Sequence, residues 1–423
     1  MIRFIDLFAG IGGIRLGFEQ ACQSLNLSTQ CELSSEIDKN ACETYFLNFN
    51  ERPKGDIREI KTFPDFDFLL AGFPCQAFSY AGKMNGFGDT RGTLFFEIER
   101  ILRQYKPKAF LLENVRGLTT HDNGRTFKTI LDKLESIGYG VQFLKLNSSD
   151  FGIPQNRMRV YIVGILGCVP NITLDSNWGA VDSHKYKSHS LLSFFKKNYP
   201  KVYLRDILDI NVSDKYYCSS KFTKALVEYA GGDLRKLYGY RLIDFRGGHS
   251  IHSWDLGIKG YCTESEVFFM NALISNRRKK SFGVHQDGKK LTKEQIQKFY
   301  DEENLDSVLE SLTIKGYLKY KDGLYNPTCG NMSFEVFKIL DPNSISITLV
   351  SSDAHKLGVI VDKTSIRRIT PRECARLQGF PDDFLLHPSD SSAYKQIGNS
   401  VSVPVIKEVA CDFLKNNKIF GDS

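Results

Sequence analysis

The chain has 423 residues, of which 42% are hydrophobic and 25% charged, and its formal net charge is +7. These values predict two or three domains of an ordinary globular protein, exclude collagen-like and low-complexity chains, and are compatible with a polyanionic partner. Apolar runs such as 68–73 are far shorter than the roughly 18 residues of a membrane helix, and no signal-peptide pattern is visible. The ten Cys are scattered without zinc spacing, which argues against a disulfide framework and favours a reducing cytoplasm.

Strand-like and helix-like patterns alternate over about the first 165 residues. Buried strands are predicted at 2–8, 66–72, 108–115, 141–146 and 159–165. Between them, apolar residues recur at helical spacing over 14–25, 94–105 and 127–137. This alternation predicts βαβ units and a mostly parallel sheet, in which ligands bind at the carboxyl ends of the strands.

Regular alternation is lost between about 170 and 365, where Tyr, Ser, Asn and Gly become common. Within this region, residues 263–327 have a pattern of their own. Capping-box pairs predict helices that begin after Thr263 and Thr292, and an apolar helical face runs from 305 to 312.

A hairpin with the turn Asp322-Gly323 is predicted next. Three helices before a hairpin resemble a winged helix. The alternative is an ordinary helical insertion with a solvated basic face, since eight Lys and Arg but only two Asp and Glu lie between 277 and 298. Two further helices are predicted at 371–377 and 405–414.

A Gly-rich turn at 6–13 follows the first strand and would let a ligand approach the backbone, with a helix N-terminus behind it. Arg15 stands where the third Gly of the dinucleotide pattern is expected, which weighs against a nicotinamide oxidoreductase. Glu36 ends a further strand expected between 25 and 36 and is placed to hold ribose hydroxyls, and Asp56 follows where another strand would end. The alternative is a tight turn that packs a helix on the sheet.

Cys75 comes directly after a buried strand and behind a Pro, at the edge where such sheets bind ligands. A lone Cys is more often a buried structural residue, but this position favours a nucleophile. Glu113, at the end of the next strand, is a candidate acid/base partner. Arg157 and Arg159 share one face of a strand and are placed to meet one ligand, although surface salt bridging is the alternative.

In this order the motifs resemble the DNA (cytosine-5) methyltransferases of bacterial restriction–modification systems, over about residues 1–166 and 345–410. The matching segments are 6–13, 72–76, 113–115, 155–159, 367–384 and 396–404, with Thr348-Leu349-Val350 near the end of the recognition region. The resemblance implies an α/β fold: a Rossmann-like S-adenosylmethionine-dependent methyltransferase sheet with helices on both faces, plus a smaller irregular target-recognition domain.

The resemblance also implies a domain plan. Residues 1–168 would form the catalytic and cofactor-binding domain, and 169–365 the target-recognition domain, with the winged-helix insertion at 263–327. Residues 366–423 would return to the catalytic domain. The basic stretch 277–298 would mostly contact DNA phosphates.

The mechanism implied is covalent addition to a cytosine that has been flipped out of the duplex. Cys75 would attack C6, Glu113 would protonate N3, and Arg159 would brace the carbonyl oxygen. C5 would then take the methyl group of S-adenosyl-L-methionine, which leaves S-adenosyl-L-homocysteine. The full catalytic set is Pro74, Cys75, Gln76, Glu113, Asn114, Arg157 and Arg159. A loop at 77–91 would close over the flipped base.

The cofactor pocket implied by the resemblance would be lined by both ends of the chain. Its residues are Phe8, Gly10, Gly12, Gly13, Glu36, Ile37, Asp56, Ile57, Phe73, Asn399, Ser400 and Val401. Residues 399–401 would return from the C-terminus to close it. No metal is expected: His249 and His252 form a pair without a third ligand, which favours packing or phosphate contact.

The expected partner is double-stranded DNA, with a cognate restriction endonuclease acting separately on the same site. We expect a monomer in the bacterial cytoplasm, at the nucleoid, with no membrane association. The target is not encoded in any readable pattern; a short G·C-rich palindrome such as GGNNCC is the working guess.

Two other functions remain as alternatives. A tRNA cytosine-5 methyltransferase is disfavoured because that branch usually has a second Pro where Phe73 stands, and a smaller recognition region. A DNA-binding regulator without essential catalysis is disfavoured because Cys75 and Glu113 are both present.

Overall fold

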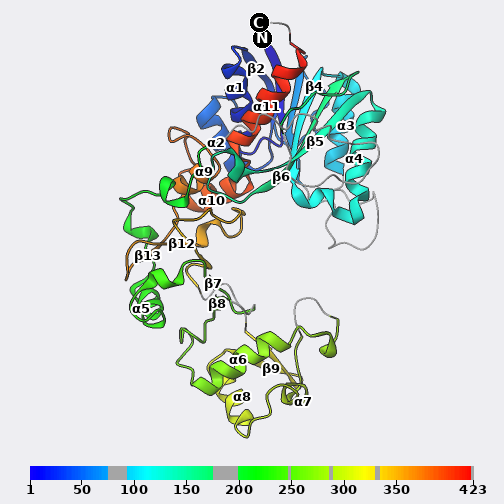
Figure 1. Ribbon diagram of the computed structural model, residues 1–423. Helices are drawn as coiled ribbons and strands as arrows, with labels where there is room; N and C mark the ends of the chain where they lie inside the picture. The colour runs from blue at the N-terminus through cyan, green and yellow to red at the C-terminus, as the bar shows by residue number, and fades with distance from the viewer. Residues whose placement is uncertain (75–92, 175–198, 246–248, 285–288, 329–333, 421–423) are drawn as a thin grey trace. The chain divides into compact units, whose positions relative to one another are not determined.

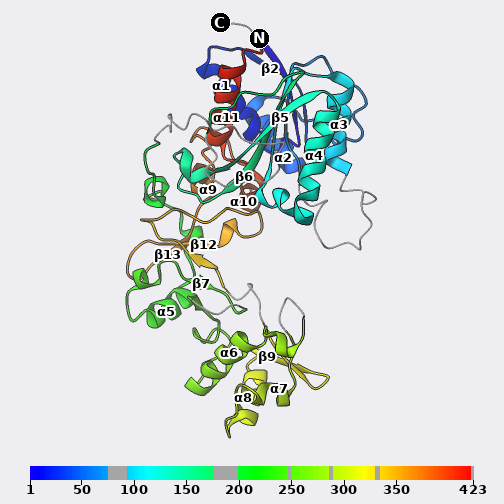
Figure 2. The same cartoon turned by 45° about the vertical axis from the view of Figure 1, so that its right-hand side comes forward.

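The computed structural model describes residues 1–74, 93–174, 199–245, 249–284, 289–328 and 334–420. Within these residues the chain forms two compact units (Figures 1 and 2). The first comprises 1–208, 345–352 and 371–423, and the second comprises 209–344 and 353–370. Cys75, Gln76 and the predicted loop at 77–91 lie outside the described residues.

The unit boundaries differ from the predicted domains in three places. Residues 169–208 and 345–352 belong to the first unit, although the domain plan assigns them to the target-recognition domain. Residues 366–370 belong to the second unit, although the plan assigns them to the C-terminal segment. The segment 345–352 joins the first unit because Ser346 pairs with Gln155 in an isolated parallel bridge. A pairing between positions so far apart in the chain leaves no trace in local composition. That the second unit recognises DNA stays a prediction.

The described part of the first unit contains a six-stranded mixed sheet. Its strands are β1 (Ile2–Leu7), β2 (Thr29–Ser35), β3 (Phe68–Gly72), β4 (Ala109–Val115), β5 (Tyr139–Asn147) and β6 (Met158–Leu166). The order across the sheet is β2-β1-β3-β4-β6-β5, and β6 runs antiparallel to both of its neighbours. Where a strand was expected before Asp56, Lys54 forms an isolated bridge with Ser35.

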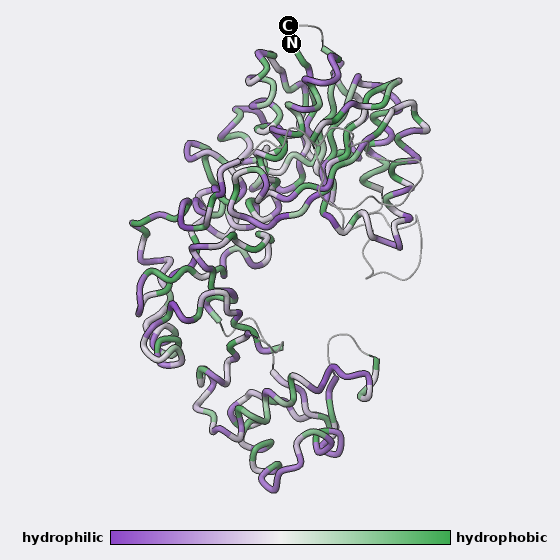
Figure 3. Tube along the Cα trace, viewed as in Figure 1, coloured by the Kyte–Doolittle hydropathy of each residue, from purple (hydrophilic) through white to green (hydrophobic). Residues whose placement is uncertain are grey.

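Helices cover both faces of this sheet (Figures 1 and 3). Side chains of a strand alternate between the two faces of the sheet, so each strand contributes residues to two separate hydrophobic cores. Leu69 of β3 packs with α3 (Thr93–Tyr105) and α4 (Arg125–Ser136). The neighbouring Phe68 packs with α1 (Gly13–Ser24) and α11 (Val403–Asn417), with its ring 4.7 Å from Phe18 and 5.8 Å from Phe413. Burial of each such side chain stabilises the fold by about 1.5–3 kcal/mol.

The C-terminal segment completes the first unit. It contributes the helices α9 (Pro371–Leu377), α10 (Asp390–Asn399) and α11. Near the N-terminus this unit also contains α2 (Lys39–Phe49), which has Asp38 as its N-cap. Helices α1 and α11 approach so closely that a Cβ on Gly17 would lie 2.7 Å from Ile406. Only Gly fits this crossing, so the first and last helices form one packed layer.

The second unit has a small sheet of its own, ordered β13-β12-β11-β7-β8 in the described residues. These strands are β7 (Arg241–Leu242), β8 (Ser250–Ile251), β11 (Lys338–Ile339), β12 (Leu357–Ile360) and β13 (Ile366–Arg368). With α5 (Ser220–Tyr229) they enclose a core that contains Leu226 and Leu242.

Residues 263–327 form the elements that the sequence predicts. The helices are α6 (Glu264–Asn276), α7 (Lys293–Gln297) and α8 (Leu305–Ile314), followed by the hairpin β9 (Leu318–Lys321) and β10 (Leu324–Pro327). Reciprocal capping boxes at Thr263 and Thr292 start α6 and α7. Asp322 and Gly323 have φ values of 54° and 75°, as a two-residue hairpin turn requires. Leu291 forms an isolated antiparallel bridge with Tyr325 of β10, on the edge of the hairpin.

Part of the basic stretch 277–298 serves this fold. Arg277 and Lys289 are buried. The Lys289 ammonium donates to the carbonyls of Arg278 and Lys279, at 3.2 and 3.1 Å, and Lys293 forms an ion pair with Asp306. Phosphate contact therefore stays a prediction for the exposed cations of the stretch, which are Arg278, Lys279, Lys280, Lys290 and Lys298. No helix in the described ranges is long and apolar enough to cross a membrane.

Candidate functional site

Glu113 and Arg159 face each other at one edge of the sheet. Glu113 lies opposite Tyr161 in the β4–β6 ladder, and Arg159 lies two residues before Tyr161, so both side chains share a face. The Nε of Arg159 is 3.2 Å from Oε1 of Glu113, and the side chains are only 12% and 10% exposed. Burial raises the pKa of Glu113, while the positive charges of Arg159 and Arg157 oppose that rise. The site therefore holds a carboxyl group that favours its protonated form more than a surface Glu does.

Asn114 ties this edge to the segment that leads to Cys75. Its side-chain amide is buried and donates to the carbonyl of Phe73 at 2.8 Å. The preceding residue, Gly72, is paired with Glu113 in the β3–β4 ladder. Phe73 is buried and Pro74 is exposed. The structure thus brings Phe73 and Pro74 to the edge that carries Glu113.

The alternative interpretation of Arg157, a salt bridge at the surface, is wrong. Arg157 is buried, and its guanidinium donates to the carbonyl of Leu349 at 2.7 Å and to the carbonyl of Ser400. Burial, with Arg159 nearby, lowers the pKa of Arg157 to about 9. Arg157 therefore joins β6 to two segments from the C-terminal part of the chain.

The Gly-rich turn is held open by left-handed backbone and by a carboxylate. Gly10 and Gly12 have φ values of 56° and 86°. A Cβ on Gly12 would lie 2.2 Å from the ring of Phe49, whereas around a Cβ on Gly10 the described residues leave open space. Glu36 accepts from the amide of Gly10 at 2.8 Å and from that of Ile37 at 2.9 Å. A carboxylate thus lies beside a turn whose backbone a ligand can approach.

Residues 399–401 lie against this turn. A Cβ on Gly13 would be 2.7 Å from the Ser400 hydroxyl and 3.0 Å from the Val401 side chain. Asn399 is the last residue of α10. The C-terminal segment therefore reaches the turn that begins at Phe8, whose own φ is 55°.

The other predicted pocket residues lie in different environments. Ile37 is 73% exposed, and Ile57 is buried in the core with α3 and α4. The Asp56 carboxylate is hydrogen-bonded to Arg58, which holds the pKa of that carboxyl below its usual value.

S-adenosyl-L-methionine, which the resemblance implies, fits the residues of the Gly-rich turn. The space over Gly10 leaves room for the ligand beside the backbone, and the Glu36 carboxylate is a suitable acceptor for ribose hydroxyls.

Sequence reasoning missed a buried charged cluster below the turn. Asp6 is fully buried, and neither of its carboxylate oxygens has a hydrogen-bond partner in the described part of the chain. Burial raises the pKa of Asp6 to about 7, although the positive charge of Arg15 opposes this. Arg15 donates to Glu51 at 2.7 Å and to the Tyr45 hydroxyl at 3.0 Å. An Asp inside an apolar strand was the available signal.

The two histidines singled out in the second unit serve its packing. His252 is buried, shares a 2.6 Å hydrogen bond with the Ile243 carbonyl, and stacks on Trp254 with ring centres 4.4 Å apart. His249 meets Tyr240 edge to face. Among the described residues no group of three His, Cys, Asp or Glu side chains is arranged to hold a metal ion.

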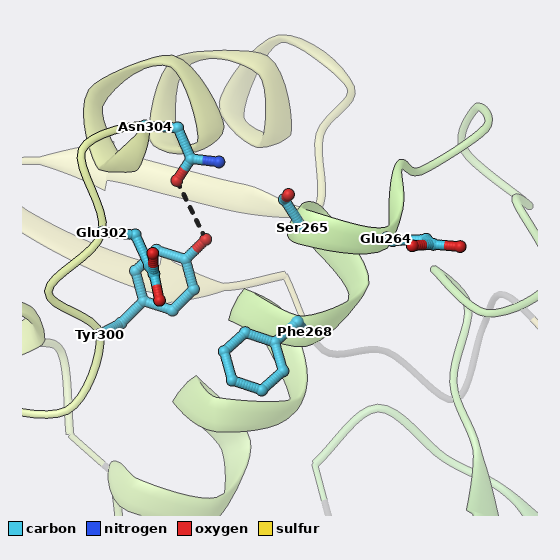
Figure 4. Close-up of a pocket in the computed structure, with 6 residues that line it drawn as sticks. All are labelled: Glu264, Ser265, Phe268, Tyr300, Glu302 and Asn304. Carbon is cyan, nitrogen blue, oxygen red and sulfur yellow. Dashed lines mark hydrogen bonds between the residues drawn. The ribbon is translucent and has the colours of Figure 1, made fainter.

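A shallow pocket in the second unit contains none of the predicted site residues (Figure 4). It is lined by Glu264, Ser265, Phe268, Tyr300, Glu302 and Asn304. The Tyr300 hydroxyl donates to the Asn304 side chain at 3.2 Å. The acidic residues around it do not suit a DNA phosphate.

Comparison with known proteins shows which family this chain resembles. The family model described as C-5 cytosine-specific DNA methylase matches residues 2–415. The chain is 64% identical over 422 residues to the type II methyltransferase M.BanI of Aneurinibacillus aneurinilyticus. This alignment covers 99% of the present chain and 98% of the relative. It is 65% identical over 418 residues to M.HgiCI of Herpetosiphon aurantiacus, with 98% of each chain covered.

Solved structures support the fold at lower identity. The Dnmt2 methyltransferase of S. pombe aligns with a TM-score of 0.52 at 18% identity and covers 98% of this chain and 99% of its own. The methyltransferase EhMeth of Entamoeba histolytica aligns with a TM-score of 0.53 at 18% identity, with 98% of each chain covered.

Proposed function

Because the chain belongs to the C-5 cytosine-specific DNA methylase family, we propose that it is the modification enzyme of a type II restriction–modification system. It is a DNA cytosine-5 methyltransferase that uses S-adenosyl-L-methionine. The six-stranded sheet is the Rossmann-like methyltransferase sheet of this enzyme. The observation that carries the assignment of the site is the buried pair formed by Glu113 and Arg159.

The chemical difficulty is that C5 of cytosine is a poor nucleophile. Addition of the Cys75 thiolate to C6 places electron density on C5, provided that N3 gains a proton. Glu113 supplies that proton, and the elevated pKa of its buried carboxyl suits the task. Arg159 keeps the carboxylate oriented during the transfer, at 3.2 Å. Asn114 holds the chain before Cys75 in register with Glu113 through its bond to Phe73.

S-adenosyl-L-methionine supplies the methyl group that C5 accepts. Phe8, Gly10 and Gly12 provide the backbone surface that holds it, and Glu36 takes its ribose hydroxyls. Residues 399–401, which lie against Gly13, exclude water from this pocket. A water molecule then takes the proton from C5, the bond between C6 and the Cys75 sulfur breaks to release the thiolate, and the N3 proton returns to Glu113, which frees the methylated base.

The second unit is the target-recognition part of the enzyme and binds double-stranded DNA. A flipped cytosine costs a few kcal/mol of unstacking, which contacts with the duplex must offset. A cognate endonuclease acts separately on the same target, and the enzyme works as a monomer at the nucleoid of a bacterial cell. The relatives named above, both bacterial and matched over almost their whole length, support this role.

Methylation sequencing of DNA from a methylation-deficient host tests the proposal directly. Cells expressing the protein should contain 5-methylcytosine at one short sequence, and cells expressing Cys75→Ala should contain none. Cys168→Ala is the matched control, because Cys168 is an exposed Cys outside every motif. Methylation by Cys75→Ala would exclude the covalent route. If DNA stays unmodified while tRNA gains 5-methylcytosine, the tRNA-directed alternative is correct.

A further inference from the structure

Four buried polar side chains form a connected cluster in the first unit. Ser148, Gln155, Gln378 and Ser402, here called the glutamine cluster, are each 0% exposed. Ser148 and Ser402 share a hydrogen bond of 2.6 Å, and the Ser402 hydroxyl donates to the Gln378 side chain at 3.2 Å. Gln155 donates to the same Gln378 oxygen at 3.4 Å. Buried polar groups that satisfy one another in this way resist rearrangement, since any broken bond leaves an unpaired group.

The first connection of the glutamine cluster is to residues 345–352. The Gln155 side-chain oxygen accepts from the Leu349 amide at 3.0 Å, and Arg157 donates to the carbonyl of the same residue at 2.7 Å. Asn156, between them, donates from its amide to the Ser346 carbonyl at 2.8 Å. Three consecutive residues before β6 thus bind both backbone groups of Leu349 and a neighbouring carbonyl.

The second connection is to the turn that closes the cofactor pocket. The Gln378 amide donates to the Ile397 carbonyl at 3.0 Å, and Arg157 donates to the Ser400 carbonyl. The Gln155 amide donates to the Leu377 carbonyl at 2.5 Å, which fixes the end of α9. Both glutamines use donor and acceptor at once, so neither segment can shift without breaking a buried bond.

These two connections join elements with different tasks. Residues 345–352 belong to the first unit, yet the chain continues at both ends of this segment into the second unit. The turn at 399–401 lies against Gly13 of the Gly-rich turn. Arg159, which contacts Glu113, lies two residues after Arg157 in the chain.

We infer that Gln155 and Gln378 are positioning residues that couple two binding events. Binding of DNA acts on residues 345–352, and the two glutamines transmit its effect to residues 399–401, which close the cofactor pocket. The inference rests on the proposed function, because it takes DNA and S-adenosyl-L-methionine as the two ligands. Coupling between two sites is a free energy that acts equally in both directions. It is therefore measurable without turnover.

The test is the variant Gln155→Glu in the full-length protein. Glu keeps the shape and the acceptor for the Leu349 amide, but it puts an oxygen where the Gln155 amide donates to Leu377 and Gln378. The control is Gln142→Glu, the same change on half-buried β5 outside the glutamine cluster. Calorimetry would measure the Kd of S-adenosyl-L-homocysteine with and without a saturating duplex that carries the methylated sequence, and the reciprocal titration would check the result.

We expect the duplex to strengthen S-adenosyl-L-homocysteine binding at least about fivefold in the wild type and in Gln142→Glu, and less than about twofold in Gln155→Glu. If the duplex strengthens S-adenosyl-L-homocysteine binding to folded Gln155→Glu by the same factor as in the wild type, the inference is wrong. A wild type that binds both ligands without coupling would also overturn it. A wild type that does not bind DNA would instead contradict the proposed function.

A second variant covers the case in which Gln155→Glu does not fold. Ser402→Ala removes the hydroxyl that joins Ser148 to Gln378 and leaves the contacts of Gln155 with Leu349 in place. We expect a coupling factor between those of the wild type and Gln155→Glu. Retention of the full wild-type factor would overturn the inference.

Discussion

Arg159 reaches across the β4–β6 ladder to within 3.2 Å of Glu113, and these two charges meet where almost no solvent reaches either side chain. The pair resolves a conflict in the chemistry. Burial raises the pKa of the Glu113 carboxyl and favours its protonated form, whereas the adjacent guanidinium favours the ionised form and so assists release of the proton to N3.

Glu113→Gln should lower the rate of methyl transfer in a single turnover by about 10²–10⁴-fold, the usual contribution of a positioned general acid. The amide keeps the shape of the carboxyl but has no acidic proton for N3. Binding of S-adenosyl-L-homocysteine should stay unchanged. Glu59→Gln, an exposed residue outside the site, is the control. A Glu113→Gln enzyme with the wild-type rate would remove Glu113 from the mechanism.

Arg159→Met should shift the pH dependence of the methyl-transfer step. The charge of Arg159 lowers the pKa of Glu113, so its removal should raise that pKa further. Glu113 acts in its protonated form, and the rate declines once the pH exceeds its pKa. The alkaline limb of the rate profile should therefore move to higher pH while the maximal rate falls. A limb that moves to lower pH would contradict this assignment of the proton.

Asp6 should make the protein less stable as the pH rises. An unfolded Asp ionises near pH 3.8, whereas burial raises the pKa of Asp6 to about 7. Between these values the folded state holds a proton that the unfolded state has lost, so the free energy of unfolding decreases with pH and levels off above 7. The difference in pKa corresponds to a loss on the order of 4 kcal/mol.

Asp6→Asn should remove this pH dependence. Denaturant unfolding at several pH values between 4 and 8 would show its stability, relative to the wild type, increasing across the window. Asp65→Asn, an exposed residue in the same unit, should leave the wild-type curve intact. A constant difference between Asp6→Asn and the wild type at every pH would mean that Asp6 ionises normally.

Two glycines of the turn should respond differently to Ala. Both have left-handed backbone, which costs a non-Gly residue about 1–2 kcal/mol. A Cβ on Gly12 also meets the Phe49 ring at 2.2 Å, so Gly12→Ala should show the larger drop in melting temperature. A Cβ on Gly10 faces open space, so Gly10→Ala should mainly weaken S-adenosyl-L-homocysteine binding. An unchanged affinity for S-adenosyl-L-homocysteine in folded Gly10→Ala would contradict the pocket proposed here.

Neutralising Lys279 and Lys280 together should weaken DNA binding uniformly across sequences. Both are exposed beside α6 in the second unit. If each contacts one phosphate, the slope of log affinity against log salt concentration should become shallower by about 2, since each contact contributes about 0.9. The matched change of Lys128 and Lys133 on α4 should not affect the slope. An unaltered slope in the first variant would leave Lys279 and Lys280 without a role in phosphate contact.

Local patterns accounted for much of the fold. The capping box at Thr263 works through residues three positions apart, so it is visible in the sequence and starts α6 as predicted. The apolar strands and the hairpin turn at Asp322 are local in the same way. Glu113 and Arg159 were grouped only by the family resemblance. In a parallel sheet the start of one strand and the end of its neighbour lie at opposite edges, and the two residues meet because β6 runs antiparallel to β4.

Features that depend on distant pairing were not predictable. Gln155 and Gln378 meet only after the chain has folded, and nothing near either residue indicates the other. Charge counting also misjudged Lys289. A Lys in a basic run is normally solvated, but Lys289 is buried and donates hydrogen bonds to two backbone carbonyls, those of Arg278 and Lys279. Residues 345–352, which the domain plan includes in 169–365, belong to the first unit for the same reason, because Ser346 pairs with the distant Gln155.

The close crossing of α1 and α11 at Gly17 has a consequence for biosynthesis. Helix α1 leaves the ribosome long before α11, yet the two cover the same face of the sheet side by side. The part of that face that α11 covers, including Phe68, stays exposed until residues 403–417 have been made. A chain terminated before Val405 would expose an apolar strand surface and aggregate instead of retaining partial activity. Host DNA gains its protection only from chains that have been translated through α11.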